Sequence, residues 1–99
     1  LLADDRPDAL VVSDETLAVG VAQAVRELHL RCPADLAVVT HATRGLDVPF
    51  GLAFTTCAFS LDRICTSLHA VLQRALDRPD DRDDTVVRIR PRIFPGQTT

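Results

Sequence analysis

Four residues just beyond two apolar runs carry the chemistry that a ligand site in this chain would use. The apolar runs are residues 9–12 and 36–40, and each has the pattern of a short strand covered on both faces. In a β-α-β unit, the carboxyl ends of the parallel strands face a crevice that binds small molecules. The candidate ligand-contacting residues are therefore Asp14, His41, Ala42 and Thr43.

Asp14 has two compatible roles. Its carboxylate would accept hydrogen bonds from the hydroxyls or amines of a ligand. It would also cap the helix that follows, because Asp and Ser are among the preferred N-cap residues, and Ser13 is an equally suitable cap. The first turn of that helix would line the crevice, so a capping Asp14 would remain close to a ligand.

His41 would donate to a ligand or titrate as a pH sensor, since histidine changes charge near neutral pH. The alternative is a partly exposed loop histidine without a role. If the two strands are neighbours, the segment 40–43 lies about 4.8 Å across from Asp14.

Hydrophobic periodicity predicts the elements that position these residues. An amphipathic helix follows Asp14 and ends before Pro33, with its apolar stripe at Leu17, Ala18, Val21, Ala24, Val25 and Leu28. Residues 41–51 are expected to form a loop, and 52–58 an extended segment. Ser60 caps a second helix, whose buried stripe is expected at Leu61, Ile64, Cys65, Leu68, Leu72, Ala75 and Leu76. The alternation over 86–94 predicts a last strand.

Length and composition fit a soluble α/β domain or a piece of one. The chain has 99 residues, 46% of them apolar and 25% charged, and a net charge of −3, which argues against nucleic-acid binding by these residues. No apolar run reaches the roughly 20 residues that span a bilayer, and no signal peptide is evident. Two parallel strands and one helix leave a sheet face bare, and Leu1 is not Met, so we expect a fragment of a longer protein.

Cysteine, histidine and motif content favour a protein without a metal, cofactor or catalytic centre. The three cysteines, Cys32, Cys57 and Cys65, lack CxxC spacing, and we expect them to be reduced and buried, as suits the cytoplasm. The histidines share no ligand spacing with them. The chain has no Gly-rich phosphate loop and no GxSxG or HExxH motif, and no nucleophile–base pair is evident from the spacing.

Two charged clusters have ordinary explanations. Residues 77–84 are rich in Asp, but they lack the Gly and terminal Glu of a calcium loop and contain neutralising arginines, so we expect a solvated turn. Arg88, Arg90 and Arg92 could contact a polyanion, but surface pairing with the nearby acidic turn is the simpler expectation.

The order of the motifs resembles the ligand-sensing domain of the lactose/galactose-repressor family. Residues 7–12 (PDALVV) match its "PDA" strand, and 14–20 (DETLAVG) resemble its "NDxxAxG" helix start. Residues 28–39 (LHLRCPADLAVV) resemble "LGLxVPxDxxVV", and 52–56 (LAFTT) match the "LTT" crossover strand.

This resemblance implies the three-layer α/β fold of periplasmic binding proteins, in which the effector binds between two subdomains joined by three crossovers. It would place residues 8–50 in the C-terminal subdomain, 52–58 in the third crossover and 60–76 in the other subdomain, with 86–94 as the final strand. A DNA-binding head and the rest of the sensor would lie upstream of these residues.

The resemblance also implies a homodimer and a small polar effector, sugar-like or of another kind. The dimer surface would include Val19, Gln23 and Leu46. The family's "GFDD" segment is replaced by residues 40–43, so Ala42 stands where a carboxylate commonly binds sugar hydroxyls, and Asp14 replaces the Asn of "ND". The function implied is non-enzymatic sensing in a cytoplasmic transcription regulator, with DNA bound only through the missing head. The alternatives are a periplasmic solute receptor for transport or chemotaxis and, with no catalytic set evident, a doubly wound α/β enzyme.

Overall fold

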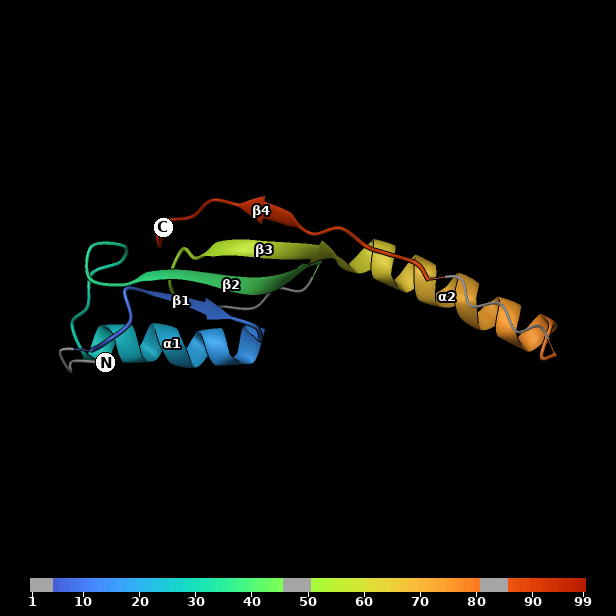
Figure 1. Ribbon diagram of the computed structural model, residues 1–99, viewed down its shortest axis with the longest axis horizontal. Helices are drawn as coiled ribbons and strands as arrows, with labels where there is room; N and C mark the ends of the chain where they lie inside the picture. Colours follow the sequence, from blue (N-terminus) through green and yellow to red (C-terminus); the bar gives the residue numbers. More distant parts are fainter. Residues whose placement is uncertain (1–4, 46–50, 81–85) are drawn as a thin grey trace.

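A computed structural model describes residues 5–45, 51–80 and 86–99 of the chain. It is a mixed α/β structure with one four-stranded sheet in the order β1-β2-β3-β4 (Figure 1). The elements are β1 (Ala9–Val12), α1 (Glu15–Glu27), β2 (Ala37–Arg44), β3 (Thr55–Ser60), α2 (Leu61–Asp77) and β4 (Arg92–Phe94).

The predicted β-α-β unit is confirmed, and its two strands are neighbours. β1 and β2 are parallel, with Ala9 opposite Ala37 and Val12 opposite Thr40. β2 also pairs in parallel with β3, whereas β4 runs antiparallel to β3. Because β1 and β2 are adjacent and parallel, their carboxyl ends lie at the same edge of the sheet as the start of α1.

α1 covers one face of the sheet and supplies half of a small core. Ala18, Ala22 and Val25 of α1 are buried, and Val21 and Ala24 are half-buried. They pack against the sheet face that carries Val12 and Val38. The expectation that Leu17 and Leu28 belong to the buried stripe is wrong: both are exposed, and the buried side of the helix is centred on Ala18, Ala22 and Val25 instead.

The opposite face of the sheet has no cover among the described residues. Val11, which alternates with the buried Val12 along β1, is 85% exposed. A continuous apolar strand of this kind is typical of a sheet covered on both faces. The bare face predicted from the sequence is therefore present.

The C-terminal residues complete the sheet beside β2, where β3 has not yet begun. The buried Thr98 donates its Oγ1 hydroxyl to the Val38 carbonyl at 2.6 Å and accepts the Thr55 N–H at 2.9 Å. The Val38 N–H in turn donates to the Thr98 carbonyl at 2.8 Å. These hydrogen bonds connect the C-terminal residues to β2 and β3. They also give partners to backbone groups that would otherwise be buried without one.

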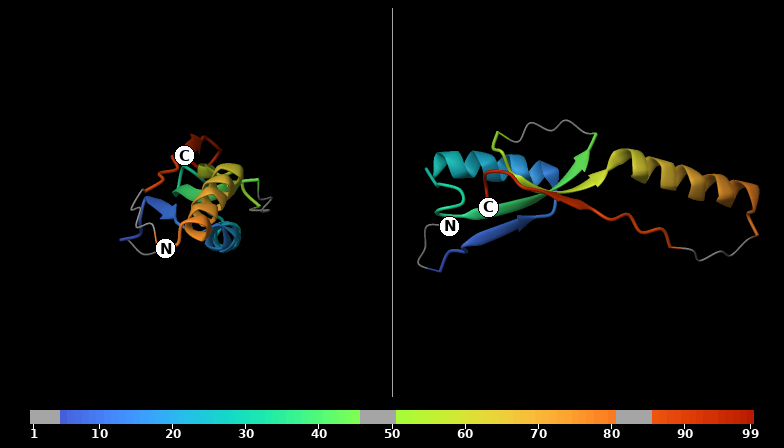
Figure 2. Two further views of the ribbon diagram at one scale, coloured as in Figure 1. Left: turned by 90° about the vertical axis from the view of Figure 1, so that its right-hand side faces the viewer. Right: turned by 90° about the horizontal axis from the view of Figure 1, so that it is seen from above.

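α2 projects from the sheet, and the molecule is 57 Å along its longest axis (Figures 1 and 2). Ser60 caps it as predicted, accepting the Arg63 N–H at 3.3 Å. The predicted burial of its apolar stripe is wrong, because no residue of α2 is buried and Leu68 is 64% exposed. Leu61 and Ile64, near the start of the helix, are half-buried, but beyond them the helix extends away from the sheet and its apolar side chains are exposed.

Three predicted boundaries also need correction. Strand β2 continues to Arg44 instead of ending at residue 40, because β3 pairs with it residue by residue over that length. β3 begins at Thr55, later than the predicted start at 52. Of the predicted final strand, only the part beside β3, Arg92–Phe94, is a strand.

The cysteines are free, as expected, but they are not fully buried. Cys65 is exposed on α2, and Cys32 and Cys57 are half-buried. Burial, with the negative charge of Asp35 as a smaller cause, raises the pKa of the Cys32 thiol. Among the described residues, no helix is both long enough and apolar enough to cross a membrane.

Candidate functional site

Asp14 is the N-cap of α1. Its backbone is extended, and its Oδ1 accepts the Thr16 N–H at 2.7 Å. Hydrogen bonds from Thr16 lower the pKa of the Asp14 carboxyl, and the charge of His41 acts weakly in the same direction. Asp14 is exposed and ionised at the carboxyl end of β1, so the structural role is established and the carboxylate remains open to solvent.

His41 lies beside the first turn of α1, where the sequence spacing placed it. Its Nε2 is 3.7 Å from Oε1 of Glu15, and its ring centroid is 5.4 Å from that of Phe59, with a tilt of 39°. The prediction of a loop position is wrong, since His41 lies within β2 opposite Cys57. A strand fixes the imidazole more firmly than a loop, and about a third of its side chain remains exposed.

Ala42 and Thr43 also lie within β2, not beyond its end as expected. Both line a hollow of about 220 Å³ that lies over the carboxyl end of β2 and the neighbouring part of β3. The other lining residues are Arg44, Thr56, Ala58 and Phe94. Side chains alternate along paired strands, so Ala42, Arg44 and Ala58 share one face of the sheet.

Arg44 and Phe94 form the polar and aromatic walls of this hollow. The guanidinium carbon of Arg44 is 4.9 Å from the centroid of the Phe94 ring, within the range of a cation–π contact. Phe94 is held there because β4 places it opposite Thr56 of β3. The contact therefore joins the end of β2 to the last strand across β3.

The structure divides the predicted site into two parts, because successive residues of a strand point to opposite faces of the sheet and His41 therefore faces away from Ala42. Asp14 and His41 gather at the start of α1, together with Glu15. Ala42 and Thr43 belong to the hollow that Arg44 and Phe94 line. Sequence reasoning missed the last two residues. Arg44 could have been found as the continuation of the polar segment 40–43, whereas only the pairing of β3 with β4 brings Phe94 there.

Two of the three predicted dimer residues are exposed on α1. Val19 and Gln23 lie on the side of the helix away from the sheet, and Gln23 donates to Glu27 at 2.9 Å. Leu46 lies outside the described residues. The dimer surface thus remains a prediction.

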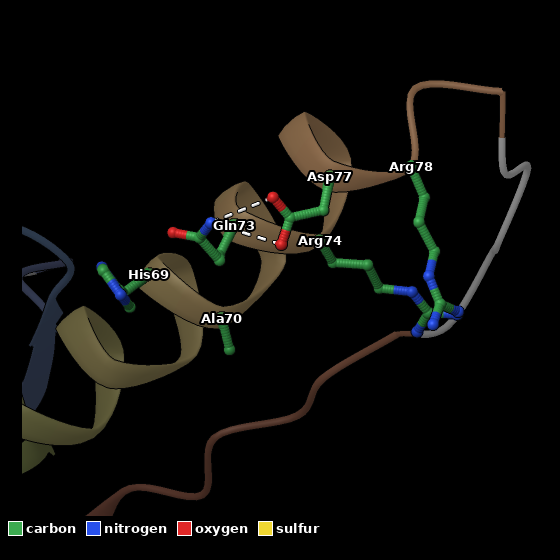
Figure 3. A pocket seen from close by; sticks show the side chains of 6 residues that line it. All are labelled: His69, Ala70, Gln73, Arg74, Asp77 and Arg78. Carbon is green, nitrogen blue, oxygen red and sulfur yellow. Dashed lines mark hydrogen bonds between the residues drawn. The ribbon is translucent and has the colours of Figure 1, made fainter.

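A second hollow, of about 430 Å³, lies against α2 (Figure 3). Its described lining comes from one exposed helix and its end: His69, Ala70, Gln73, Arg74, Asp77 and Arg78. Gln73 donates to both carboxylate oxygens of Asp77, at 3.2 and 3.3 Å, so these two groups satisfy each other. The side chains of Arg74 and Arg78 point the same way, away from His69 (Figure 3).

The two charged clusters are only partly described by the structure, and their predicted roles are not tested by it. Residues 81–84 of the acidic cluster lie outside the described residues, and Asp77 and Asp80 are exposed. Arg88 and Arg90 precede β4, and Arg92 begins it, and all three are exposed. Within the described ranges, no group of three or more histidine, cysteine or acidic side chains is arranged to hold a metal ion.

The fold is that of a mixed α/β domain with adjacent parallel strands, a class in which small ligands commonly bind beyond the carboxyl ends of the strands. A family model described as a periplasmic binding protein-like domain matches the whole chain, residues 1–99. The chain belongs to this family, whose domains bind small ligands, and it is part of a ligand-binding module. Searches of the curated proteins and of the solved structures gave no match.

Proposed function

We propose that this chain is part of the effector-binding and dimerisation module of a cytoplasmic transcription regulator, without catalytic activity. The observation that supports it most is the pairing of two adjacent parallel strands whose carboxyl ends carry Asp14, His41, Ala42 and Thr43. The family match supports ligand binding, and the motif series 7–12, 14–20, 28–39 and 52–56 supports the regulator over other members.

In this proposal, the effector is a small polar molecule bound between two subdomains. Residues 8–50 belong to the C-terminal subdomain, 52–58 to the crossover and 60–76 to the other subdomain, with 86–94 returning to the sheet. The exposed apolar residues of α2, Leu68 and Leu72 among them, support its placement against further structure. Effector binding favours one closure state, and the dimer transmits this population shift to DNA-binding heads.

The test is to read the coding region immediately upstream of Leu1 and to assay the intact protein for DNA retention. A helix-turn-helix or winged-helix head, with DNA retention that changes when an effector is added, supports a regulator. A secretory signal peptide in that region, with a protein found outside the cytoplasm, overturns the proposal in favour of a solute receptor.

A further inference from the structure

The hollow beside the carboxyl end of β2 has, in its described lining, the charge of a site for an anion. Among the six described residues that line it, Arg44 is the only charged one, and none is acidic. The alanines at positions 42 and 58 offer no side-chain acceptor, and Thr56 offers a neutral hydroxyl. A polyhydroxylated neutral ligand is usually held by carboxylates or amides that accept its O–H groups, and this hollow lacks both.

Arg44 is arranged to donate to an oxyanion. Its guanidinium lies 4.9 Å from the Phe94 ring centroid, and within the described chain no carboxylate lies within ion-pair distance of it. A guanidinium carries five N–H donors, so a cation–π contact with one ring leaves N–H groups available to a ligand. Those groups form the fork that binds carboxylate and phosphate oxygens in pairs.

The position of Arg44 suits a ligand and not only the fold. It is the last residue of β2 and it is exposed, so its charge is not needed to satisfy a buried partner. Ala42 and Ala58 sit side by side in register and leave open space beside it. A hollow of about 220 Å³ admits a molecule of the size of a single sugar or aromatic ring.

We propose that this hollow binds the oxyanion group, carboxylate or phosphate, of a small ring-sized effector through the guanidinium of Arg44, with Phe94 holding that guanidinium in place. The proposal rests on the ligand-binding function argued above and names the chemical class of the ligand. The charge at the strand ends is thus divided: acidic groups at the start of α1, and a cation in the hollow.

The experiment compares ligands that share a ring and differ in whether they carry a neutral hydroxyl, a carboxylate or a phosphate. The probes are glucose, glucuronate and glucose 6-phosphate, and separately benzyl alcohol, benzoate and phenyl phosphate. Binding to the intact protein is measured by ligand-observed NMR and calorimetry, in a buffer free of other carboxylates and phosphates. At least one anion is expected to bind at least tenfold more tightly than its neutral counterpart, and the tighter anion identifies the group.

Variants of Arg44 then test the mechanism. Arg44→Gln should lower the affinity for the anion by about tenfold to a hundredfold, which is the usual effect of losing a charged hydrogen-bond partner. The affinity for the neutral probe should not change. Arg44→Lys keeps the positive charge but not the paired N–H groups of the guanidinium, so it should lose less affinity for the anion than Arg44→Gln. Phe94→Leu should lower the affinity for the anion a few-fold, because the cation–π contact that holds Arg44 is lost. Arg78→Gln makes the same charge change at the end of α2 and should have no effect.

The remaining outcomes separate this proposal from the one on which it rests. A neutral probe that binds as tightly as its anions, with no effect of Arg44→Gln, overturns the anion site and leaves the ligand-binding function standing. Failure of all six probes to bind also overturns the anion site, while the regulator is judged independently by DNA retention and by the upstream coding region.

Discussion

The Nε2 atom of His41 lies 3.7 Å from Oε1 of Glu15, which joins the polar end of β2 to the first turn of α1. The contact becomes an ion pair when His41 is protonated. The contact forms because β1 and β2 are adjacent and parallel, with Val12 opposite Thr40. The chain that connects β1 to α1 therefore passes close to His41. This polar contact is therefore built from segments that are distant in the sequence.

Replacing Asp14 tests its two roles separately. Asp14→Ala removes the acceptor for the Thr16 N–H and should lower the folding equilibrium constant about fivefold, the ordinary effect of losing an N-cap. Urea unfolding followed by circular dichroism measures this. Asp14→Asn keeps a cap without the charge and should remain close to wild type in stability. If Asp14 also contacts the effector, both variants weaken effector binding by calorimetry, and unchanged affinity in both rejects that contact.

Asp35 should contribute to stability only above acidic pH. Hydrogen bonds from the Arg31 side chain and backbone N–H lower the pKa of its carboxyl from 3.8. Because the folded-state pKa is the lower one, the contribution is present above about pH 4 and is lost as the pH falls through the folded value. Asp35→Asn should therefore be less stable than wild type at pH 7, and the difference should shrink towards pH 2. Asp80→Asn, on an exposed turn, is the control, and a pH-independent difference for Asp35→Asn contradicts the prediction.

Thr98 should be essential for the C-terminal closure of the sheet. Thr98→Val keeps the shape but leaves the Thr55 N–H and the Val38 carbonyl without this hydroxyl, which should cost about 1–3 kcal/mol of unfolding free energy. Thr98→Ser keeps the hydroxyl and should lose much less. Chemical denaturation of the wild type and the two variants measures the free energies of unfolding. Equal losses of unfolding free energy in Thr98→Val and Thr98→Ser would assign the effect to packing instead of hydrogen bonding.

Two glycines should respond to alanine in opposite directions. A Cβ at Gly96 would overlap the backbone carbonyls of Ala53 and Phe54, so Gly96→Ala should destabilise by about 1–3 kcal/mol. A Cβ at Gly20, within α1, meets nothing within 4 Å, and Gly20→Ala should stabilise by about 0.5–1 kcal/mol. Thermal unfolding compares them, and a neutral Gly96→Ala would mean that the C-terminal segment does not lie against residues 53–54.

The proposed dimer surface is tested at Val19. An acidic side chain at this exposed position would be desolvated in an interface, so Val19→Asp should raise the dimer dissociation constant at least tenfold. Analytical ultracentrifugation of the intact protein measures this, with Val86→Asp, at an exposed position before β4, as the matched change outside that surface. An unchanged dissociation constant for Val19→Asp removes α1 from the interface.

Local patterns in the sequence determined β1, the capped start of α1, the Ser60 cap of α2 and the parallel β-α-β unit. These features depend on near neighbours: alternation of apolar and polar residues, and the hydrogen-bonding reach of Asp and Ser side chains. The bare sheet face could also be predicted, since one helix cannot cover both sides of a sheet. Asp14 could be placed for the same reason, because the end of β1 and the helix cap that follows it are local features of the sequence.

The tertiary structure alone decided where β2 ends and what surrounds Ala42. Pairing with β3 extends β2 to Arg44, and pairing of β4 with β3 brings Phe94 beside that arginine. The burial of Thr98 likewise depends on hydrogen bonds to Val38 and Thr55, which lie far away in the sequence. Periodicity predicted an apolar stripe on α2 correctly but not its exposure, because a helix buries its apolar side only where another element lies against it.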